Sequence, residues 1–425
     1  MKAKAFFSIL MAFCSSAHVV AQTSSPFDRT LRVDYQFEGD ARNQSISVME
    51  LCSLKGWAGR THHMQQVPVR GNGDITLRDA RTDSVIYRQS FSTLFQEWLT
   101  TEEATQVRRS FENVFLLPMP SDSAYVTVRL FNDKPGAHDV SLRHRVDPKD
   151  ILIRQLDRLP VPEHKYLHQS GTAEEKIDVA ILAEGYTSAE MPQFYQHARE
   201  AVDAILSHEP FHLMADRFNF VAVGTPSADS DVSIPLQGLW RNTAVHSNFS
   251  TFYSDRYLTT LHQRDVHNLL AGIPYEHIII LANTHTYGGG GIYNAYMLTT
   301  THHAAFHPVV VHEFGHSFAG LADEYYYDDQ YENYYSSAAE PWEQNLTTLK
   351  DFSSKWQDML PKRTPVPTPP DPKHMDRIGV YEGGGYMSHG VFRAFQDCRM
   401  KTNECAAFCP VCQRAIQRVI DFYTR

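Results

Sequence analysis

The chain has 425 residues, of which 42% are hydrophobic and 21% charged, which is the composition of an ordinary globular protein. This length exceeds what one average domain needs, so two domains are the natural expectation. The formal net charge of −10 argues against a nucleic-acid partner or an anionic membrane surface, because both reward a basic surface. The charge does not exclude a protein or peptide partner, and it leaves the oligomeric state open.

The N-terminus has the pattern of a secretory signal peptide, which we place at residues 1–22. Lys2 and Lys4 precede a short apolar stretch at 5–13, and small residues follow. That stretch is too short to cross a bilayer, and no later segment approaches the ~20 apolar residues of a transmembrane helix. Cys14 offers a lipid anchor, but Phe13 before it fits that pattern poorly. We expect export to the periplasm or the extracellular space, without a transmembrane segment.

Residues 25–150 predict a β-sandwich-like domain. Short runs alternate apolar and polar residues with period two and are rich in β-branched and aromatic side chains, which indicates half-buried strands. The clearest runs are 31–37, 74–78 and 124–131. One short helix is expected at 101–111.

Residues 151–175 are polar and carry two prolines, which suits a linker, and residues 176–425 read as a second domain. Near-continuous apolar runs at 177–182, 218–223 and 278–281 indicate strands buried on both faces. An amphipathic helix is expected at 188–208. Strands alternating with helices predict a mixed α/β domain, so the whole chain is of the α+β, mixed class.

The stretch 307–325 contains the pattern His312-Glu313-Phe-Gly-His316. Residues four apart share one face of an α-helix, so both imidazoles can reach one metal ion. Glu313 can then address a water bound to that metal. The alternative is a buried helix with two core histidines that bind no metal.

The flanking residues support a helix that stops soon after the motif. Pro308 suits a first helical turn, where its missing N–H costs nothing. Gly320 stands where a helix end needs left-handed backbone, and Asp323 follows as a possible third ligand.

Two segments around this helix have open interpretations. Four glycines at 288–291 permit close approach of another backbone, either a substrate strand added to a sheet edge or a surface turn. After the motif, an aromatic and acidic stretch offers a calcium site whose spacing matches no known loop. Its candidate ligands are Asp328, Asp329 and Glu332.

Removal of the signal peptide leaves five cysteines, four of them near the C-terminus. These four are Cys398, Cys405, Cys409 and Cys412. In an exported protein such a cluster first indicates disulfides, with the pairing undetermined. A structural zinc site is the alternative, because two of the cysteines have ligand spacing. Cys52 is expected to be a buried thiol.

Several stretches together resemble the immunoglobulin-A peptidase family of secreted, metzincin-like zinc metallopeptidases. They are HEFGHSFAGLADEY at 312–325, DVAILAEGYT at 178–187, EPWEQNLT at 340–347, and the segments 393–400 and 408–412. The resemblance covers roughly 176–425 and includes a β-rich leading domain. It implies a metzincin-like zinc peptidase domain behind a β-sandwich-like domain.

The resemblance also implies roles for particular residues. His312 and His316 are then zinc ligands, Glu313 is the catalytic base and Asp323 is the third ligand. In ordinary metzincins the third ligand stands six residues after the second histidine, and here Ala322 occupies that place.

This departure keeps other third ligands open: the neighbouring Glu324, or a downstream glutamate, Glu332 or Glu340. Met400 is the first candidate for a methionine turn beneath the metal, and Met387 the second.

The predicted function is a secreted zinc endopeptidase that hydrolyses peptide bonds by a glutamate-assisted, zinc-bound water. Tyr386 and His389 are candidate donors to the oxyanion. An alternative is an exported binding or adhesion protein with a structural zinc or an inactive peptidase-like domain. A zinc hydrolase acting on a different amide is a further alternative.

Overall fold

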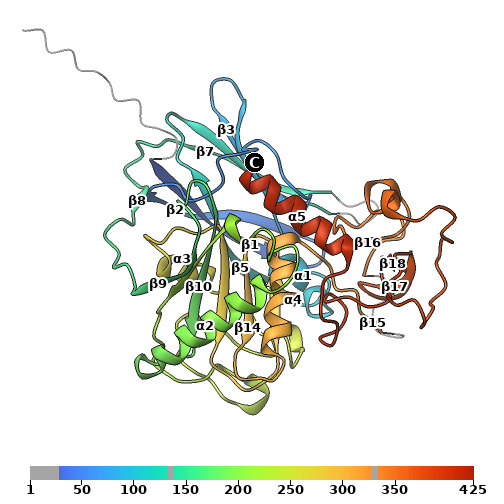
Figure 1. Cartoon of the computed structure of the whole chain (residues 1–425). Helices are drawn as coiled ribbons and strands as arrows, with labels where there is room; N and C mark the ends of the chain where they lie inside the picture. The colour runs from blue at the N-terminus through green and yellow to red at the C-terminus, as the bar shows by residue number, and fades with distance from the viewer. Residues whose placement is uncertain (1–27, 133–137, 328–333) are drawn as a thin grey trace, which may run out of the picture.

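The computed structural model describes residues 28–132, 138–327 and 334–425. Figure 1 shows the N-terminal strands packed against a mixed α/β region, with a small sheet, β15 to β18, at the right of the view. The chain is mixed α/β with a β-rich N-terminal part, as predicted. In the part of the chain that is described, no helix is both long and apolar enough to cross a bilayer.

Two four-stranded sheets form the N-terminal part, which explains the period-two pattern of the sequence. The first has the order β5-β1-β2-β8 and the second β4-β3-β6-β7. The first comprises Arg29–Gly39 (β1), Gln44–Lys55 (β2), Arg109–Pro118 (β5) and Arg154–Gln155 (β8). The second comprises Gly73–Asp79 (β3), Val85–Phe91 (β4), Ala124–Leu130 (β6) and Val140–Val146 (β7).

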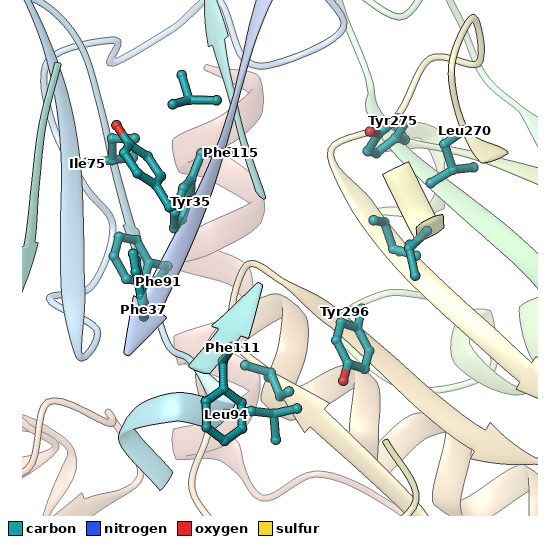
Figure 2. Close-up of a cluster of buried hydrophobic side chains, with 14 of the residues drawn as sticks. Tyr35, Phe37, Ile75, Phe91, Leu94, Phe111, Phe115, Leu270, Tyr275 and Tyr296 are labelled. Carbon is teal, nitrogen blue, oxygen red and sulfur yellow. The ribbon is translucent and has the colours of Figure 1, made fainter. Parts of the chain in front are cut away.

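Aromatic side chains fill the space between these two sheets. Figure 2 shows Tyr35, Phe37 and Phe115 of the first sheet beside Ile75 and Phe91 of the second. The Phe91 and Phe115 ring centroids are 4.6 Å apart. Alternate residues of each strand thus enter one sandwich core.

The helix expected at 101–111 is not formed. The structure has a short helix at Leu94–Trp98 (α1), a single 3-10 turn at Glu103–Thr105, and strand β5 from Arg109 onward. Phe111 pairs with Phe37 of β1. Pairing along the whole length of β1 outweighs the weak local preference of this polar segment.

A six-stranded sheet of order β13-β14-β12-β10-β11-β9 forms the centre of the second part. The inner strands β10, β11, β12 and β14 run parallel, and β9 and β13 are antiparallel edge strands. The strands are His164–Gln169 (β9), Ile177–Glu184 (β10), Phe218–Val223 (β11), His277–Ala282 (β12), Gly289–Ile292 (β13) and Tyr296–Thr300 (β14).

The segment expected to be a linker, 151–175, contains two strands. β8 pairs with β2 of the N-terminal part, and β9 pairs with β11 of the central sheet. The connector therefore adds an edge strand to each part. β9 satisfies backbone groups of β11 that would otherwise be unpaired.

Both faces of the central sheet are covered. Ile177, Val179 and Ile181 of β10 face helices Met191–Leu206 (α2), Phe306–Ala319 (α4) and Pro410–Thr424 (α5). Ala180 and Leu182 join the core that contains the N-terminal sandwich, where Figure 2 shows Leu270, Tyr275 and Tyr296. This two-sided burial was predicted from the continuous apolar runs.

Polar contacts join the N-terminal sheets to helix Gln263–Leu269 (α3). The Arg32 and Asp34 side chains are fully buried and form an ion pair of 2.7 Å. Arg264 of α3 donates to Asp34 at 3.0 Å, and Arg32 donates to Asn268 at 2.8 Å. The two parts therefore share buried charges as well as one apolar core.

The remaining small sheet has the order β15-β18-β16, with β17 paired to β18. Its strands are Tyr326–Tyr327 (β15), Leu346–Thr347 (β16), Tyr381–Gly384 (β17) and Tyr386–Arg393 (β18). Its first strand, β15, is the first strand after α4 in the chain. The short 3-10 turns elsewhere are Ser188–Glu190, Ala215–Arg217, Pro235–Gln237, Thr251–Tyr253, Phe352–Ser354 and Gln357–Met359.

His277 provides a test of the packing between α4 and α5. Its ring lies 4.8 Å from Phe318 and 5.4 Å from Tyr423, and burial lowers its pKa to about 3. In the unfolded chain this histidine has its ordinary pKa of about 6.5, so it is protonated below that pH, whereas in the folded chain it stays neutral. The free energy of unfolding therefore falls as the pH drops below about 6.5. At 1.4 kcal/mol per pH unit, we expect about 2 kcal/mol of this loss by about pH 5.

Replacing this histidine by phenylalanine, His277→Phe, should remove that part of the acid sensitivity. Urea unfolding at neutral pH and at about pH 5 measures it, with the exposed His389→Phe as the control. An equal acid loss in His277→Phe and the parent protein would contradict the burial of a neutral imidazole.

Candidate metal centre

Helix α4 places the two motif histidines on one face. It spans Phe306–Ala319, so Pro308 lies in the first turn, as predicted. No side chain caps its N-terminus, and Val310, Val311 and Phe314 are fully buried. Packing against the central sheet therefore holds this helix, since its β-branched residues favour helix weakly.

The helix ends at Gly320, which has φ +60°. The Gly320 N–H donates to the His316 carbonyl at 2.9 Å, and the Leu321 N–H donates to the Gly315 carbonyl at 3.2 Å. A Cβ at Gly320 would come within 2.5 Å of the Trp342 ring. Glycine is required here for its conformation and for space, as expected for a helix stop.

The turn returns Asp323 to the histidine face of α4. Asp323 Oδ1 lies 3.0 Å from His312 Nε2 and 3.2 Å from His316 Nε2. The two Nε2 atoms are 2.9 Å apart. All three side chains are largely buried, with 13%, 15% and 8% of their surfaces exposed. The structure thus brings together the three residues expected to be metal ligands.

Backbone carbonyls orient both imidazoles. His312 Nδ1 donates to the Arg399 carbonyl at 3.0 Å, and His316 Nδ1 donates to the Leu321 carbonyl at 2.6 Å. A neutral imidazole that donates from Nδ1 has a lone pair on Nε2. Two nitrogen lone pairs and a carboxylate oxygen therefore face one another, and a divalent cation fits this donor set.

The charges of these groups are strongly coupled. Burial alone would raise the pKa of Asp323, yet the charge of His316 and hydrogen bonds from both histidines hold it well below its usual range. Burial would lower the pKa of His316, but the Asp323 carboxylate raises it to about 9. Without a metal, the carboxylate therefore stabilises a positive charge at this point.

Glu313 lies beside the ligands and against the glycine strand β13. A Cβ at Gly289 would lie 2.9 Å from Glu313 Oε1, and one at Gly291 would lie 3.2 Å from Oε2 and 2.9 Å from His316 Cβ. Burial raises the pKa of Glu313, while the charges of both motif histidines lower it. A carboxylate with a raised pKa is a stronger base.

The glycines of β13 therefore allow other parts of the same chain to pack closely against this strand. Toward α4, the missing side chains of Gly289 and Gly291 leave space for Glu313 and His316. On the other, Gly289 forms a β-bridge with Tyr257, and a Cβ at Gly290 would lie 2.6 Å from the Tyr257 ring. The outer edge of β13 is partly covered there, so these glycines are not simply an open edge for a substrate strand.

Of the two candidate oxyanion donors, only Tyr386 lies at the cluster. Its hydroxyl donates to Asp323 Oδ2, and its backbone has φ +67°. Such a backbone is strained for tyrosine, and strain of this kind is frequent at functional sites. His389 follows three positions later on β18, which puts it on the other face of the strand. Its side chain is 86% exposed and faces Glu382 instead.

Glu324 and Glu340, the alternative third ligands within the described residues, have other contacts. Glu324 follows Asp323 but points away from the histidines, and its Oε1 accepts hydrogen bonds from Asn345 and Cys412. Glu340 Oε2 accepts hydrogen bonds from the Lys350 and Asp351 N–H groups. Glu332, which is the last alternative ligand and also a calcium candidate, lies outside the described residues, as do the other calcium candidates Asp328 and Asp329.

Met400 lies beneath the helix, as expected for a methionine turn. It is fully buried, and a Cβ at Gly315 would lie 2.9 Å from its sulfur. Its carbonyl accepts the Glu324 N–H at 2.8 Å. Met387, the second candidate, lies in the small sheet near Tyr335, whose N–H is 3.2 Å from its sulfur.

Sequence reasoning missed Arg256 and Glu97. Arg256 lies over the Tyr325 ring at 5.7 Å and donates to the Tyr327 hydroxyl at 2.9 Å. Glu97 of α1 accepts a hydrogen bond from Tyr257, and burial raises its pKa to about 7. No periodic pattern or motif marks either residue, because long-range folding alone brings them here.

A hollow of about 420 Å³ lies next to the cluster. Its lining residues are Tyr325, Tyr326, Tyr327, Lys401 and Thr402. The Tyr325 ring contacts the Tyr386 ring, whose hydroxyl donates to Asp323, so a molecule held in this hollow would lie near the candidate metal ligands.

The five cysteines in the described part of the chain are free thiols, contrary to the expected disulfides. Cys398 Sγ and Cys412 Sγ are 3.8 Å apart, which is far beyond the S–S bond length of about 2.05 Å. Cys52 is a buried free thiol, as predicted.

A helix that carries two histidines and a glutamate, with a carboxylate returned to it by a turn, is the arrangement of a metallopeptidase. The family model described as IgA Peptidase M64 matches residues 166–378 and 370–420. The model described as Peptidase M64 N-terminus matches residues 24–140. No curated protein matches the chain. The chain belongs to the IgA peptidase M64 family, which makes it a peptidase of a metallopeptidase class that acts on protein substrates.

Asp323 can be tested as a ligand by its amide, Asp323→Asn. The amide keeps the shape of the Asp323 side chain but removes the negative charge that, together with the two histidines, would bind the metal. We expect the affinity of the histidine site for zinc to fall at least about 100-fold, measured by competition with a chromophoric chelator.

Glu340→Gln is the matched control, because Glu340 is an alternative third ligand and its side chain lies outside both groups of candidate metal ligands. Unchanged affinity in Asp323→Asn together with a loss in Glu340→Gln would assign the third ligand to Glu340.

Proposed function

We propose that this protein is an exported, zinc-dependent endopeptidase whose active site is formed by His312, His316, Asp323 and Glu313. The convergence of two imidazole nitrogens and one carboxylate oxygen within 3.2 Å carries this proposal. Zinc is the metal most often bound by such a set of three protein ligands with an open position. The charged and apolar pattern of the first 22 residues supports export.

Bound zinc would polarise the scissile carbonyl and acidify a water. The chain supplies the remaining steps. Glu313 accepts a proton from the attacking water and later donates it to the leaving amine. Its partly buried place against β13 keeps the carboxylate in one position and raises its pKa, which suits both transfers.

Tyr386 has two roles in this proposal. By donating to Asp323 Oδ2, its hydroxyl directs Oδ1 of the same carboxylate toward the histidines. A phenol has one O–H, so the hydroxyl takes its second role, stabilising the negative charge on the carbonyl oxygen, only when it turns from Asp323 to the bound substrate. His389 has no role here, because its side chain is exposed on the other face of β18.

The hollow formed by the three tyrosines is the proposed binding place for a substrate side chain. Tyr325 contacts Tyr386, with ring centroids 5.3 Å apart, so the hollow adjoins the reacting centre. Lys401 gives it a positive charge. An aromatic or acidic substrate residue next to the cleaved bond suits this lining.

Replacing the proposed base by alanine, Glu313→Ala, should leave zinc bound but abolish peptide hydrolysis. The expected fall in kcat is at least about 1,000-fold, since both proton transfers are lost. Hydrolysis of a denatured protein and zinc content, measured on the same sample, test this. Full activity in zinc-loaded Glu313→Ala would remove Glu313 as the base, and chelator-insensitive activity in the parent protein would overturn the zinc mechanism.

A further inference from the structure

A second group of potential metal ligands lies behind the candidate active site. It consists of Glu324, Cys398, Cys409 and Cys412, whose ligand atoms all lie within 4.8 Å of one another. All four residues are buried, and the most exposed, Cys409, shows only 5% of its surface. They come from three segments: the turn after α4, the segment before Met400, and the first turn of α5.

The distances within this group suit tetrahedral zinc. Zinc binds thiolate at about 2.3 Å, so two sulfurs of a tetrahedral site lie about 3.8 Å apart. Cys398 Sγ and Cys412 Sγ are 3.8 Å apart. For a sulfur and a carboxylate oxygen the expected separation is about 3.5 Å. Cys412 Sγ and Glu324 Oε1 are 3.2 Å apart.

Glu324 is the second observation that points to a cation. Its side chain is fully buried, and Asn345 donates to Oε1 at 3.0 Å. Its Oε2 has no hydrogen-bond partner among the described residues. A buried carboxylate oxygen without a partner costs free energy unless a cation is close. Three thiols in an apolar core do not require such a carboxylate.

The start of helix α5 favours negative charge at the sulfurs. Cys409 is the N-cap residue of this helix, and its N–H donates to Cys398 Sγ at 3.2 Å. The free N–H groups and the positive end of the helix dipole stabilise thiolates, which are the form that binds zinc. Cys409 and Cys412 also have the two-residue separation of zinc-ligand pairs.

We propose that Cys398, Cys409, Cys412 and Glu324 bind a second zinc ion, which is structural. Four protein ligands close the coordination shell, and no position remains for a water or a substrate. This use of the cysteines replaces disulfides, although the protein is proposed to be exported.

This second ion stabilises the geometry of the first site. Asp323 and Glu324 are neighbours whose side chains point to opposite sides, so a metal that binds Glu324 fixes the direction of Asp323. Cys398 directly precedes Arg399, whose carbonyl orients His312, and Met400, which lies beneath the helix. The structural ion thus anchors the two segments that complete the histidine site.

The test separates the two sites by metal content. The parent protein should bind two zinc equivalents by elemental analysis. A double variant, His312→Ala with His316→Ala, should keep one equivalent. Replacing that zinc by cobalt should give the strong near-ultraviolet absorption of thiolate-to-cobalt charge transfer, which histidine and carboxylate ligands do not produce.

Cysteine variants complete the test. Cys398→Ser and Cys412→Ser should each lose the equivalent that the histidine variant keeps. Cys405→Ser is the matched control, because its sulfur lies in the same segment but outside the group and contacts the Ala407 carbonyl. If the cysteine variants do not fold, the histidine variant still decides the question.

Two results would overturn the proposal. One is a double histidine variant that binds no metal. The other is a disulfide among Cys398, Cys409 and Cys412, found by mass spectrometry of the alkylated, unreduced protein. Neither result depends on peptidase activity, so failure of the second site is distinguishable from failure of the proposed function.

Discussion

The candidate metal centre depends on the reversal of the chain at Gly320. Helix α4 presents two histidines, but a carboxylate can join them only if the helix stops and the backbone turns back within a few residues. The left-handed backbone of Gly320 makes that turn, and the Trp342 ring fills the place of any Cβ. As a result Asp323 lies 3.0 Å from His312. Without the turn, α4 would be an ordinary buried helix.

The turn also connects the two ligand groups. Consecutive carboxylates leave it in opposite directions, Asp323 toward the histidines and Glu324 toward the cysteines. The strand that follows, β15, runs parallel to β18. Gly385, just before β18, donates to the Asp323 carbonyl, and Tyr386, the first residue of β18, donates to the Asp323 side chain. The segment 398–400 closes the site from below. Three stretches of sequence, the α4 histidines, residues 385–386 and residues 398–400, therefore fix one carboxylate.

The N-terminal part belongs to the same physical unit. Its sandwich core continues onto one face of the central sheet, and Arg32 and Asp34 are buried against α3. Glu97 and Tyr257 extend this contact to β13, the strand that supports Glu313. A role for the N-terminal strands in holding the active-site strand follows from these contacts.

Local signals in the sequence were enough to predict the central strands, α4 with its stop at Gly320, and the pair His312 and His316. These features follow from periodicity and motif spacing. The same signals offered Asp323 only as a possible third ligand, and the family resemblance put it ahead of the other carboxylates. The helix expected at 101–111 failed because pairing with β1 overrides a weak local preference. The strand β9 and the covered edge of β13 depend on long-range pairing, which a single sequence does not specify.

The family match and the geometry together make one claim central: the histidines of α4 and Asp323 bind a catalytic zinc. Anomalous diffraction at the zinc absorption edge, from crystals of the protein as purified, tests it most directly. The account predicts a zinc peak bonded to His312 Nε2, His316 Nε2 and Asp323 Oδ1, with an open position beside Glu313. A peak completed by a different carboxylate in place of Asp323, or no peak at the two histidines, would contradict it.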